Sequence, residues 1–126
     1  MVLILDDVRG VIAAFGLALR RMDVEFVGVG TLAEARQCLP RNTWTAFILD
    51  LELPDGSGLD LLEELRSLPE YRRTPTTVIT ANVMIDESTL RRIDLAGASL
   101  HCGVFGSSET AEICRWLLGR DAGRTP

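Results

Sequence analysis

Residues 46–58 read AFILDLELPDGSG, and their pattern is the most informative one in the chain for its architecture. Its four leading apolar residues end at Asp50, a pattern that is typical of a strand buried on both faces of a sheet. The loop after Asp50 holds Pro54, Gly56 and Gly58, and leucines then recur at helical spacing. The stretch therefore predicts one β–α unit. The leucines expected to face inward on its helix are Leu59, Leu62, Leu65 and Leu68.

Two similar units precede this one. Residues 2–5 and 24–29 are strand-like, and a helical pattern over 8–22 separates them. Thr31 and Glu34 form a capping box, which predicts the start of a second helix, and we expect Pro40 to end it.

Two further units follow. The β-branched residues of 76–80 predict a fourth strand, and 100–105 predict a weaker fifth one. Met84, Leu90 and Ile93 mark a helix that ends near residue 97. Ser107 or Ser108 is expected to cap a last helix. The residues expected on its buried side are Ile113, Cys114, Leu117 and Leu118. Five β–α units imply a parallel sheet with helices on both faces.

Composition limits the classes of function. The chain has 126 residues, which suits one domain, and its net charge of −5 argues against nucleic acid as a direct partner. No apolar run approaches the roughly 20 residues that cross a bilayer, and no signal peptide precedes the first strand, so we expect a cytoplasmic protein without a membrane partner. Cys38, Cys102 and Cys114 are interpreted as reduced, mostly buried thiols rather than metal ligands. All 13 basic residues are arginines.

Acidic residues stand where the predicted strands end. Asp6 and Asp7 follow the first strand, Asp50 ends the third, and Thr80 ends the fourth. A single aspartate there is typical of a helix cap or a solvated loop, but the three together favour a site, because ligands bind at the carboxyl ends of parallel strands. Neighbouring carboxylates repel one another unless a cation lies among them, and oxygen ligands favour Mg²⁺. A carboxylate beside Mg²⁺ can act as a nucleophile toward a phosphoryl donor.

Four motifs, in order along the chain, resemble the receiver domain (CheY-like) of bacterial two-component response regulators. They are the acidic strand end LILDD at 3–7, the phosphoacceptor segment ILDLELPDGSG at 48–58, VITA at 78–81, and Gly97-Ala98. The resemblance implies a flavodoxin-like α/β fold, a doubly wound (βα)5 five-stranded parallel sheet with strand order 2-1-3-4-5. It also implies a receiver domain over residues 1–119, followed by a polar tail over 120–126.

The resemblance further implies a role for each acidic residue. Asp50 would be the phosphoacceptor. Asp7 and Asp50 would be carboxylate ligands of Mg²⁺, Asp6 would act through a water, and the backbone carbonyl of Glu52 would complete the protein ligands. Thr80 would be the switch hydroxyl that bonds a phosphoryl oxygen.

Three further positions concern tuning and switching in the same family. Glu52 and Asn82 lie where receivers tune the lifetime of the phosphoryl group. His101 falls near the place of an aromatic side chain that rotates with the switch hydroxyl. We interpret His101 as a strand histidine without a special role; the alternative is that it is the rotating group or a pH-sensitive contact.

The chain departs from the family at the end of the fifth strand. Receivers usually carry Lys-Pro there, whereas Val104 and Phe105 occupy the two places, and the chain has no lysine. A phosphoryl group would thus lose one of its two cationic partners. Arg9 follows the acidic pair and is interpreted as a solvated residue of the first helical turn; the alternative is that it reaches into the pocket.

Three functions are consistent with parts of this pattern. The first is a phosphorelay receiver, not an enzyme beyond assisting its own phosphorylation, that takes a phosphoryl group from a histidine kinase or phosphotransfer protein. It would switch a downstream protein partner through the fourth helix, fifth strand and fifth helix. The second is a degenerate receiver-like module that binds its partner without phosphorylation. The third, a small Mg²⁺-dependent phosphatase, is disfavoured because Glu52 stands where such enzymes place a second Asp. Met84, Leu90 and Trp116 fit either a homodimer face or core packing.

Overall fold

The computed structural model describes residues 1–120, and five parallel strands form its central sheet. They are β1 (Val2–Leu5), β2 (Phe26–Val29), β3 (Ala46–Asp50), β6 (Thr76–Thr80) and β7 (Ser99–Cys102). Their order in the sheet is β2-β1-β3-β6-β7, which is the order 2-1-3-4-5 when these five strands are counted along the chain. The predicted flavodoxin-like fold is therefore confirmed.

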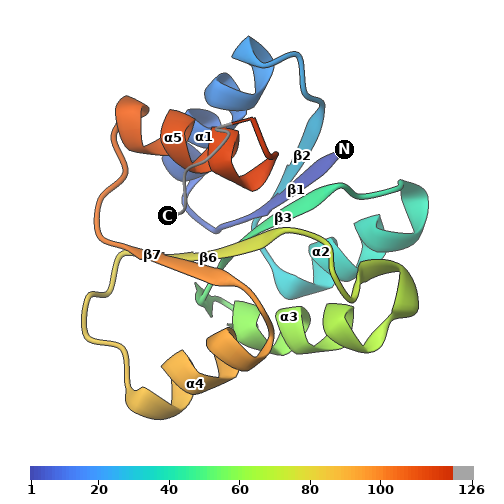
Figure 1. Ribbon diagram of the computed structural model, residues 1–126, viewed down its shortest axis with the longest axis vertical. Coiled ribbons are helices and arrows are strands. Elements are labelled where there is room, and N and C mark those ends of the chain that lie inside the picture. The colour runs from blue at the N-terminus through green and yellow to red at the C-terminus, as the bar shows by residue number, and fades with distance from the viewer. Residues whose placement is uncertain (121–126) are drawn as a thin grey trace.

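Helices cover both faces of the sheet (Figure 1). On one face lie α1 (Arg9–Arg21) and α5 (Ser107–Leu117). On the other lie α2 (Leu32–Cys38), α3 (Gly58–Ser67) and α4 (Glu87–Leu95). Short 3₁₀ turns span Leu39–Arg41 and Pro69–Tyr71. A small antiparallel hairpin, β4 (Glu52–Leu53) and β5 (Gly56–Ser57), joins β3 to α3. No helix within residues 1–120 has the length and apolarity needed to span a membrane.

The sheet divides the core into two apolar clusters. Every residue of β1, β3 and β6 is buried, which explains why these strands read as unbroken apolar or β-branched runs. Alternate side chains of one strand point to opposite faces, so Phe47 packs with α2 and α3 while Ile48 packs with α1 and α5. Helix α4 buries only Ile93, so it is the least embedded of the five helices.

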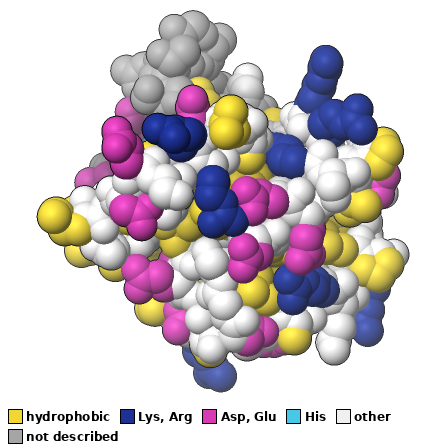
Figure 2. All heavy atoms as spheres, turned by 90° about the horizontal axis from the view of Figure 1, so that it is seen from below, with side chains coloured by type: hydrophobic (Ala, Val, Ile, Leu, Met, Phe, Trp, Pro, Cys, Tyr) yellow, Lys and Arg dark blue, Asp and Glu magenta, His cyan; other side chains and the backbone are white. Residues whose placement is uncertain are grey.

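Exposed ion pairs connect the helices of one face. Arg36 of α2 pairs with Glu64 of α3, and Arg92 of α4 pairs with Glu63 and Asp60 of α3. Figure 2, which views the molecule from the side of α3 and α4, shows acidic and basic side chains intermingled there. This face therefore lacks the continuous basic surface that phosphate backbones require.

The start of α4 differs from the sequence prediction. Met84 was expected to mark this helix, but it lies in the preceding loop and is 83% exposed. The helix begins after Asp86, whose side chain accepts a 2.7 Å hydrogen bond from the backbone N–H of Thr89. The prediction for Met84 was therefore wrong. The helix starts where a side chain caps it, and apolar spacing alone does not reveal that position.

Differences also occur around α5. Strand β7 ends at Cys102 instead of residue 105, because Gly103 turns the chain with a φ of 108°. The N-cap of α5 is Gly106 without a side-chain hydrogen bond, so the prediction of a serine cap was wrong. Cys102 is exposed and Cys38 only half-buried, so the prediction of mostly buried thiols holds for Cys114 alone.

Smaller differences lie at other element ends. Strand β2 starts at Phe26 rather than at residue 24, and α2 ends at Cys38, with Pro40 inside the following 3₁₀ turn. Leu68 was expected to face inward, but it follows the end of α3 and is exposed. The predicted polar tail, apart from Arg120, lies outside the described residues.

Candidate functional site

Three carboxylates meet at the carboxyl edge of the sheet. Asp6 and Asp7 follow β1, and Asp50 is the last residue of the neighbouring strand β3. One ligand oxygen from each lies within 4.8 Å of the others. Asp6 and Asp50 are 5% and 8% exposed, whereas Asp7 is exposed to solvent. Strand pairing thus brings together the three acidic residues that the sequence singled out.

The electrostatics of this cluster favour a bound cation. Burial and the nearby negative charge of Asp6 raise the pKa of Asp50 from 3.8 to about 7. Burial also raises the pKa of Asp6. This effect outweighs the lowering by the 2.8 Å hydrogen bond that Asp6 Oδ1 accepts from the backbone N–H of Val8. None of the ion pairs between residues 1–120 involves these three aspartates. Hard divalent cations bind such all-oxygen clusters, so the residues present fit Mg²⁺.

Close backbone packing fixes the position of Asp50. The backbone N–H of Glu52 donates to Asp50 Oδ1 at 3.3 Å, and that of Gly58 donates to the carbonyl of Leu51 at 3.1 Å. A Cβ atom at Gly58 would lie 1.9 Å from the carbonyl oxygen of Asp50, so only glycine fits there. Ser57 then caps α3 by accepting a hydrogen bond from the N–H of Leu59. The PDGSG turn thus returns the chain directly beneath the acidic residue.

Thr80 lies on the next strand, at the end of β6. Its buried hydroxyl accepts a 3.1 Å hydrogen bond from the N–H of Asn82. Asn82 in turn accepts from the N–H of Met84 at 2.9 Å, and its side-chain amide donates to Glu52 at 3.5 Å. The two positions expected to tune the phosphoryl lifetime therefore contact each other across the mouth of the site.

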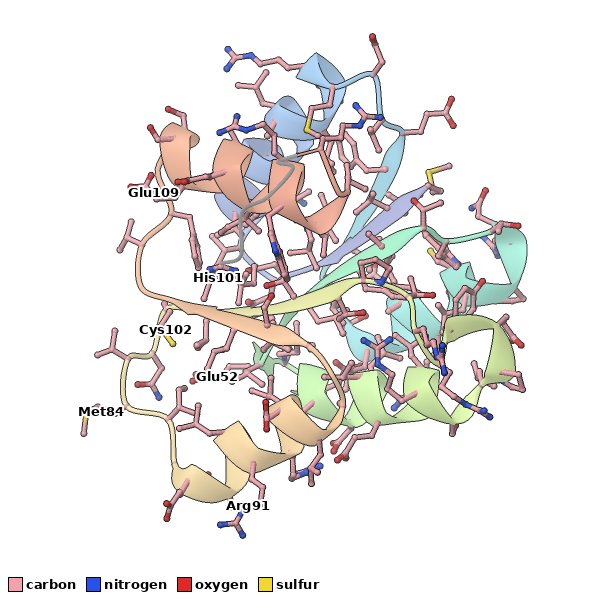
Figure 3. The ribbon with its side chains drawn as sticks, viewed as in Figure 1. Glu52, Met84, Arg91, His101, Cys102 and Glu109 are labelled. Atoms are coloured by element: carbon pink, nitrogen blue, oxygen red, sulfur yellow. The ribbon has the colours of Figure 1, made fainter. Side chains whose placement is uncertain are left out.

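The end of β7 carries no cation. Val104, in the place of the family's lysine, is 95% exposed, and the ring of Phe105 packs 5.8 Å from that of Phe15. Cys102 pairs with Thr80 in the sheet and is exposed on the same edge as Glu52 (Figure 3). Arg9 is exposed at the start of α1, as the solvated interpretation predicts.

His101 faces α5 rather than the acidic cluster. Its ring lies 6.5 Å from that of Trp116 in an edge-to-face arrangement, and its buried Nε2 has no hydrogen-bond partner among the described residues. Burial lowers the pKa of His101, so the neutral imidazole is favoured. Trp116 is half-buried, whereas Met84 projects away from the molecule (Figure 3).

Two residues near the site make contacts that the sequence did not predict. Asp55 accepts hydrogen bonds from two backbone N–H groups of α2, and Gly58 makes the close contact described above. Both lie inside the PDGSG turn. The Gly58 contact follows from the tight strand–turn–helix spacing. The partners of Asp55 lie 22 and 23 residues away, so no local sequence pattern predicts them.

Comparisons with known proteins agree with this arrangement. The family model of the response regulator receiver domain matches residues 2–99. The response regulator protein PilR of Pseudomonas aeruginosa is 33% identical over 84 residues, which make up 67% of this chain and 18% of that protein. The chain therefore spans about a fifth of the length of this curated relative.

Solved structures show the same fold. A CheY-like response regulator receiver domain protein from Methanospirillum hungatei JF-1 superposes with a TM-score of 0.81 at 19% identity, over 94% of this chain and 92% of that one. The beryllofluoride-activated NtrC4 receiver domain dimer gives a TM-score of 0.79 at 18% identity, over 94% and 95% of the two chains.

This chain belongs to the response regulator receiver domain family of two-component signalling. Members of this family are signalling domains that take up a phosphoryl group on an aspartate.

Proposed function

We propose that Asp50 accepts a phosphoryl group from a histidine kinase or phosphotransfer protein, with Mg²⁺ bound beside it, and that phosphorylation changes the affinity of this domain for a protein partner. The observation that carries this proposal is the acidic cluster, in which Asp6, Asp7 and Asp50 bring their oxygens within 4.8 Å of one another. Buried carboxylates that repel one another are costly for the fold unless they serve a cation.

The transfer is a displacement at phosphorus. An oxygen of Asp50 attacks phosphorus, a P–O bond forms, and the bond from phosphorus to the donor histidine nitrogen breaks. The imidazole leaves with the electron pair and takes a proton from solvent. Mg²⁺, held by Asp7, Asp50 and the carbonyl of Glu52, with Asp6 acting through a water, would neutralise charge on the transferred group.

Two observations support the proposed response of Thr80 to the new group. Its strand is next to that of Asp50, and its hydroxyl proton is free for donation because the bond to Asn82 uses the oxygen as acceptor. Donation to a phosphoryl oxygen would draw Thr80 and the loop after it toward Asp50. A bistable element biased in this way is sufficient for a switch.

The face formed by α4, β7 and α5 is the proposed output surface. It carries exposed apolar side chains on α4, of which Leu95 is 80% exposed, and Leu90 is also exposed. A downstream protein or a second copy of this domain would bind there, in keeping with the dimeric state of the NtrC4 receiver. We further propose a cytoplasmic domain without nucleic acid or membrane partners.

One observation favours a second candidate. Val104 occupies the place of the lysine and is 95% exposed, so no cation of β7 supports the phosphoryl group. A degenerate module that binds its partner without phosphorylation would tolerate this loss. The intact acidic cluster and Thr80 favour the phosphorylated receiver.

The test is incubation with Mg²⁺ and acetyl phosphate, followed by intact mass measurement. The expected result is one phosphoryl adduct that requires Mg²⁺ and is absent from Asp50→Asn, with Asp60→Asn as the control for loss of an acidic residue elsewhere. A folded wild-type protein that binds Mg²⁺ but forms no adduct would favour the degenerate module. Failure to bind Mg²⁺ would contradict the metal site.

A further inference from the structure

We propose that Asp55 is a positioning residue for the metal site: by bonding the N-terminus of α2, it holds the β4–β5 hairpin and with it the backbone carbonyl of Glu52. The inference rests on the proposed function, because it assumes that this carbonyl is a ligand of Mg²⁺. Asp55 lies between β4 and β5, outside the strands β1 and β3 that carry the acidic cluster.

The contact joins two elements that are distant in sequence. Asp55 Oδ1 accepts a 2.8 Å hydrogen bond from the backbone N–H of Leu32, and Oδ2 accepts one of 3.0 Å from that of Ala33. Both carboxylate oxygens are therefore used, and the pKa of Asp55 is lowered by these N–H groups. The adjacent Gly56 lies against the same helix, since a Cβ atom there would come within 2.8 Å of Leu32 Cδ1.

The remaining hydrogen bonds of the hairpin to the rest of the molecule lie at its base. At the base, Glu52 bonds Asp50 and Gly58 bonds Leu51. Residues 53–56 form the tip, and within residues 1–120 the hydrogen bonds from this tip to another element are the two that Asp55 accepts. Without them, the tip would be held by its packing and by the pairing of Glu52 with Ser57 and of Leu53 with Gly56.

The position of the tip bears on the metal because Glu52 lies in β4, one arm of the hairpin. Its N–H, in the peptide that joins it to Leu51, bonds Asp50. Its carbonyl, the proposed ligand, belongs to the next peptide, which leads toward the tip, so a displacement of the tip would reorient this carbonyl. Metal sites tolerate small errors in ligand position poorly, and groups that orient ligands without touching the metal contribute strongly to affinity.

The competing explanation is that Asp55 merely caps a helix. Thr31 provides the control, because its hydroxyl accepts a 3.1 Å hydrogen bond from the N–H of Glu34 and thereby caps the same helix. Thr31 does not belong to the hairpin. Removal of either side chain therefore weakens the start of α2, but only removal of Asp55 releases the tip.

The experiment is a titration of metal-free protein with Mg²⁺ alone, monitored through the backbone amide signals in NMR spectra. It compares wild type, Asp55→Ala, Asp55→Asn and Thr31→Ala. We expect Asp55→Ala to raise the dissociation constant for Mg²⁺ about tenfold, at the low end of the effect of groups that orient metal ligands. Its Glu52 amide signal should shift before any metal is added. Asp55→Asn keeps one acceptor oxygen and should lie between Asp55→Ala and wild type, while Thr31→Ala should bind like wild type.

Equal Mg²⁺ affinities for Asp55→Ala and Thr31→Ala would overturn the inference and leave Asp55 a helix cap. Should Asp55→Ala fail to fold, the comparison of Asp55→Asn with Thr31→Ala decides by the same criterion. A wild-type protein without a saturable Mg²⁺ response would instead overturn the proposed metal site, and the inference would fall with it.

Discussion

Val104 shows how one side chain can change the chemistry of the site without changing the fold. It is 95% exposed, so it contacts little of the protein, and it lies in the loop just beyond β7. A dianionic phosphoryl group on Asp50 would gain no charge-assisted hydrogen bond from this position. Such bonds are about twice as strong as neutral ones, so their loss should slow phosphorylation.

Introducing a cation at this position should therefore accelerate the transfer. We expect Val104→Lys to react with acetyl phosphate at least about tenfold faster than wild type, because a cationic donor at a developing charge contributes strongly to transition-state stabilisation. The measurement is the initial rate of adduct formation by intact mass. Val104→Met, which has similar length without charge, should react like wild type; equal rates for the two variants would show that the loop directs this side chain away from the site.

The turn from β3 into α3 depends on the absence of one side chain. Gly58 packs its Cα directly on the carbonyl of Asp50, and a methyl group there would lie 1.9 Å from that oxygen. Strand, hairpin and helix are all connected at this point, so none can move aside independently.

Substitution of two helical glycines should therefore have opposite effects. Gly58→Ala is expected to lower the free energy of unfolding by about 2 to 3 kcal/mol, as overpacking of rigid backbone does. A methyl group at Gly10, in α1, would meet no neighbouring atom within 4 Å, so Gly10→Ala should raise it by about 0.5 to 1 kcal/mol through helix propensity. Urea unfolding of both variants measures this difference, and destabilisation of both would contradict the role of the close contact.

Helix α4 is attached to the rest of the molecule by few groups. It buries only Ile93; Arg66 of α3 donates to the carbonyl of Ala96 at 2.6 Å, and Arg92 donates to Glu63 at 3.0 Å. Arg66 also donates to two carbonyls near the 3₁₀ turn after α3, so the C-terminal end of α4 is the better anchored end. The N-terminal end adjoins the loop that contains Asn82 and Met84, where the switch is expected.

Removal of the ionic attachment should loosen this helix alone. Arg92→Ala is expected to accelerate amide hydrogen exchange of α4, because local opening governs exchange in weakly packed elements. Arg36→Ala removes the corresponding pair between α2 and α3 and should leave α4 unchanged. Exchange monitored by NMR or mass spectrometry measures both effects, and unchanged protection of α4 in Arg92→Ala would show that Ile93 and Arg66 suffice to hold it.

The acidic cluster links the stability of the whole domain to pH. In the metal-free protein, the pKa of Asp50 is raised to about 7, so between its ordinary value of 3.8 and 7 the native state keeps a proton that the unfolded state has lost. The free energy of unfolding should therefore fall as pH rises through this window. Burial of His101 acts in the opposite direction below its ordinary pKa of 6.5, so variants must be compared with wild type at each pH.

Asp50→Asn removes this titration. The free energy of unfolding of the variant minus that of wild type should increase by about 2 kcal/mol from pH 5.5 to pH 8, since one pKa unit corresponds to about 1.4 kcal/mol. The measurement is denaturant unfolding in the presence of a chelator. A difference between the two proteins that does not change with pH would show that Asp50 is ionised throughout the range, and saturating Mg²⁺ should raise the stability of wild type alone by mass action.

Much of the architecture could be predicted from local patterns. The apolar runs of β1 and β3 and the β-branched run of β6 identify buried strands, and the motif around Asp50 identifies the turn and the helix after it. The resemblance to receivers supplied the strand order. Errors occurred where side-chain caps and single glycines decide the boundary, as at Asp86 before α4 and at Gly103 after β7.

From the sequence alone it could be inferred where β1, β3 and β6 end, and therefore which acidic groups would meet at one edge, because strand period and burial are local properties of the chain. The sequence also determined that no lysine stands beside the site. The tertiary structure was needed to show how deeply Asp6 and Asp50 are buried, that Val104 is exposed to solvent, and that Asp55 bonds the start of α2. These features depend on distances between segments far apart in the chain, and such distances follow from packing rather than from any local pattern.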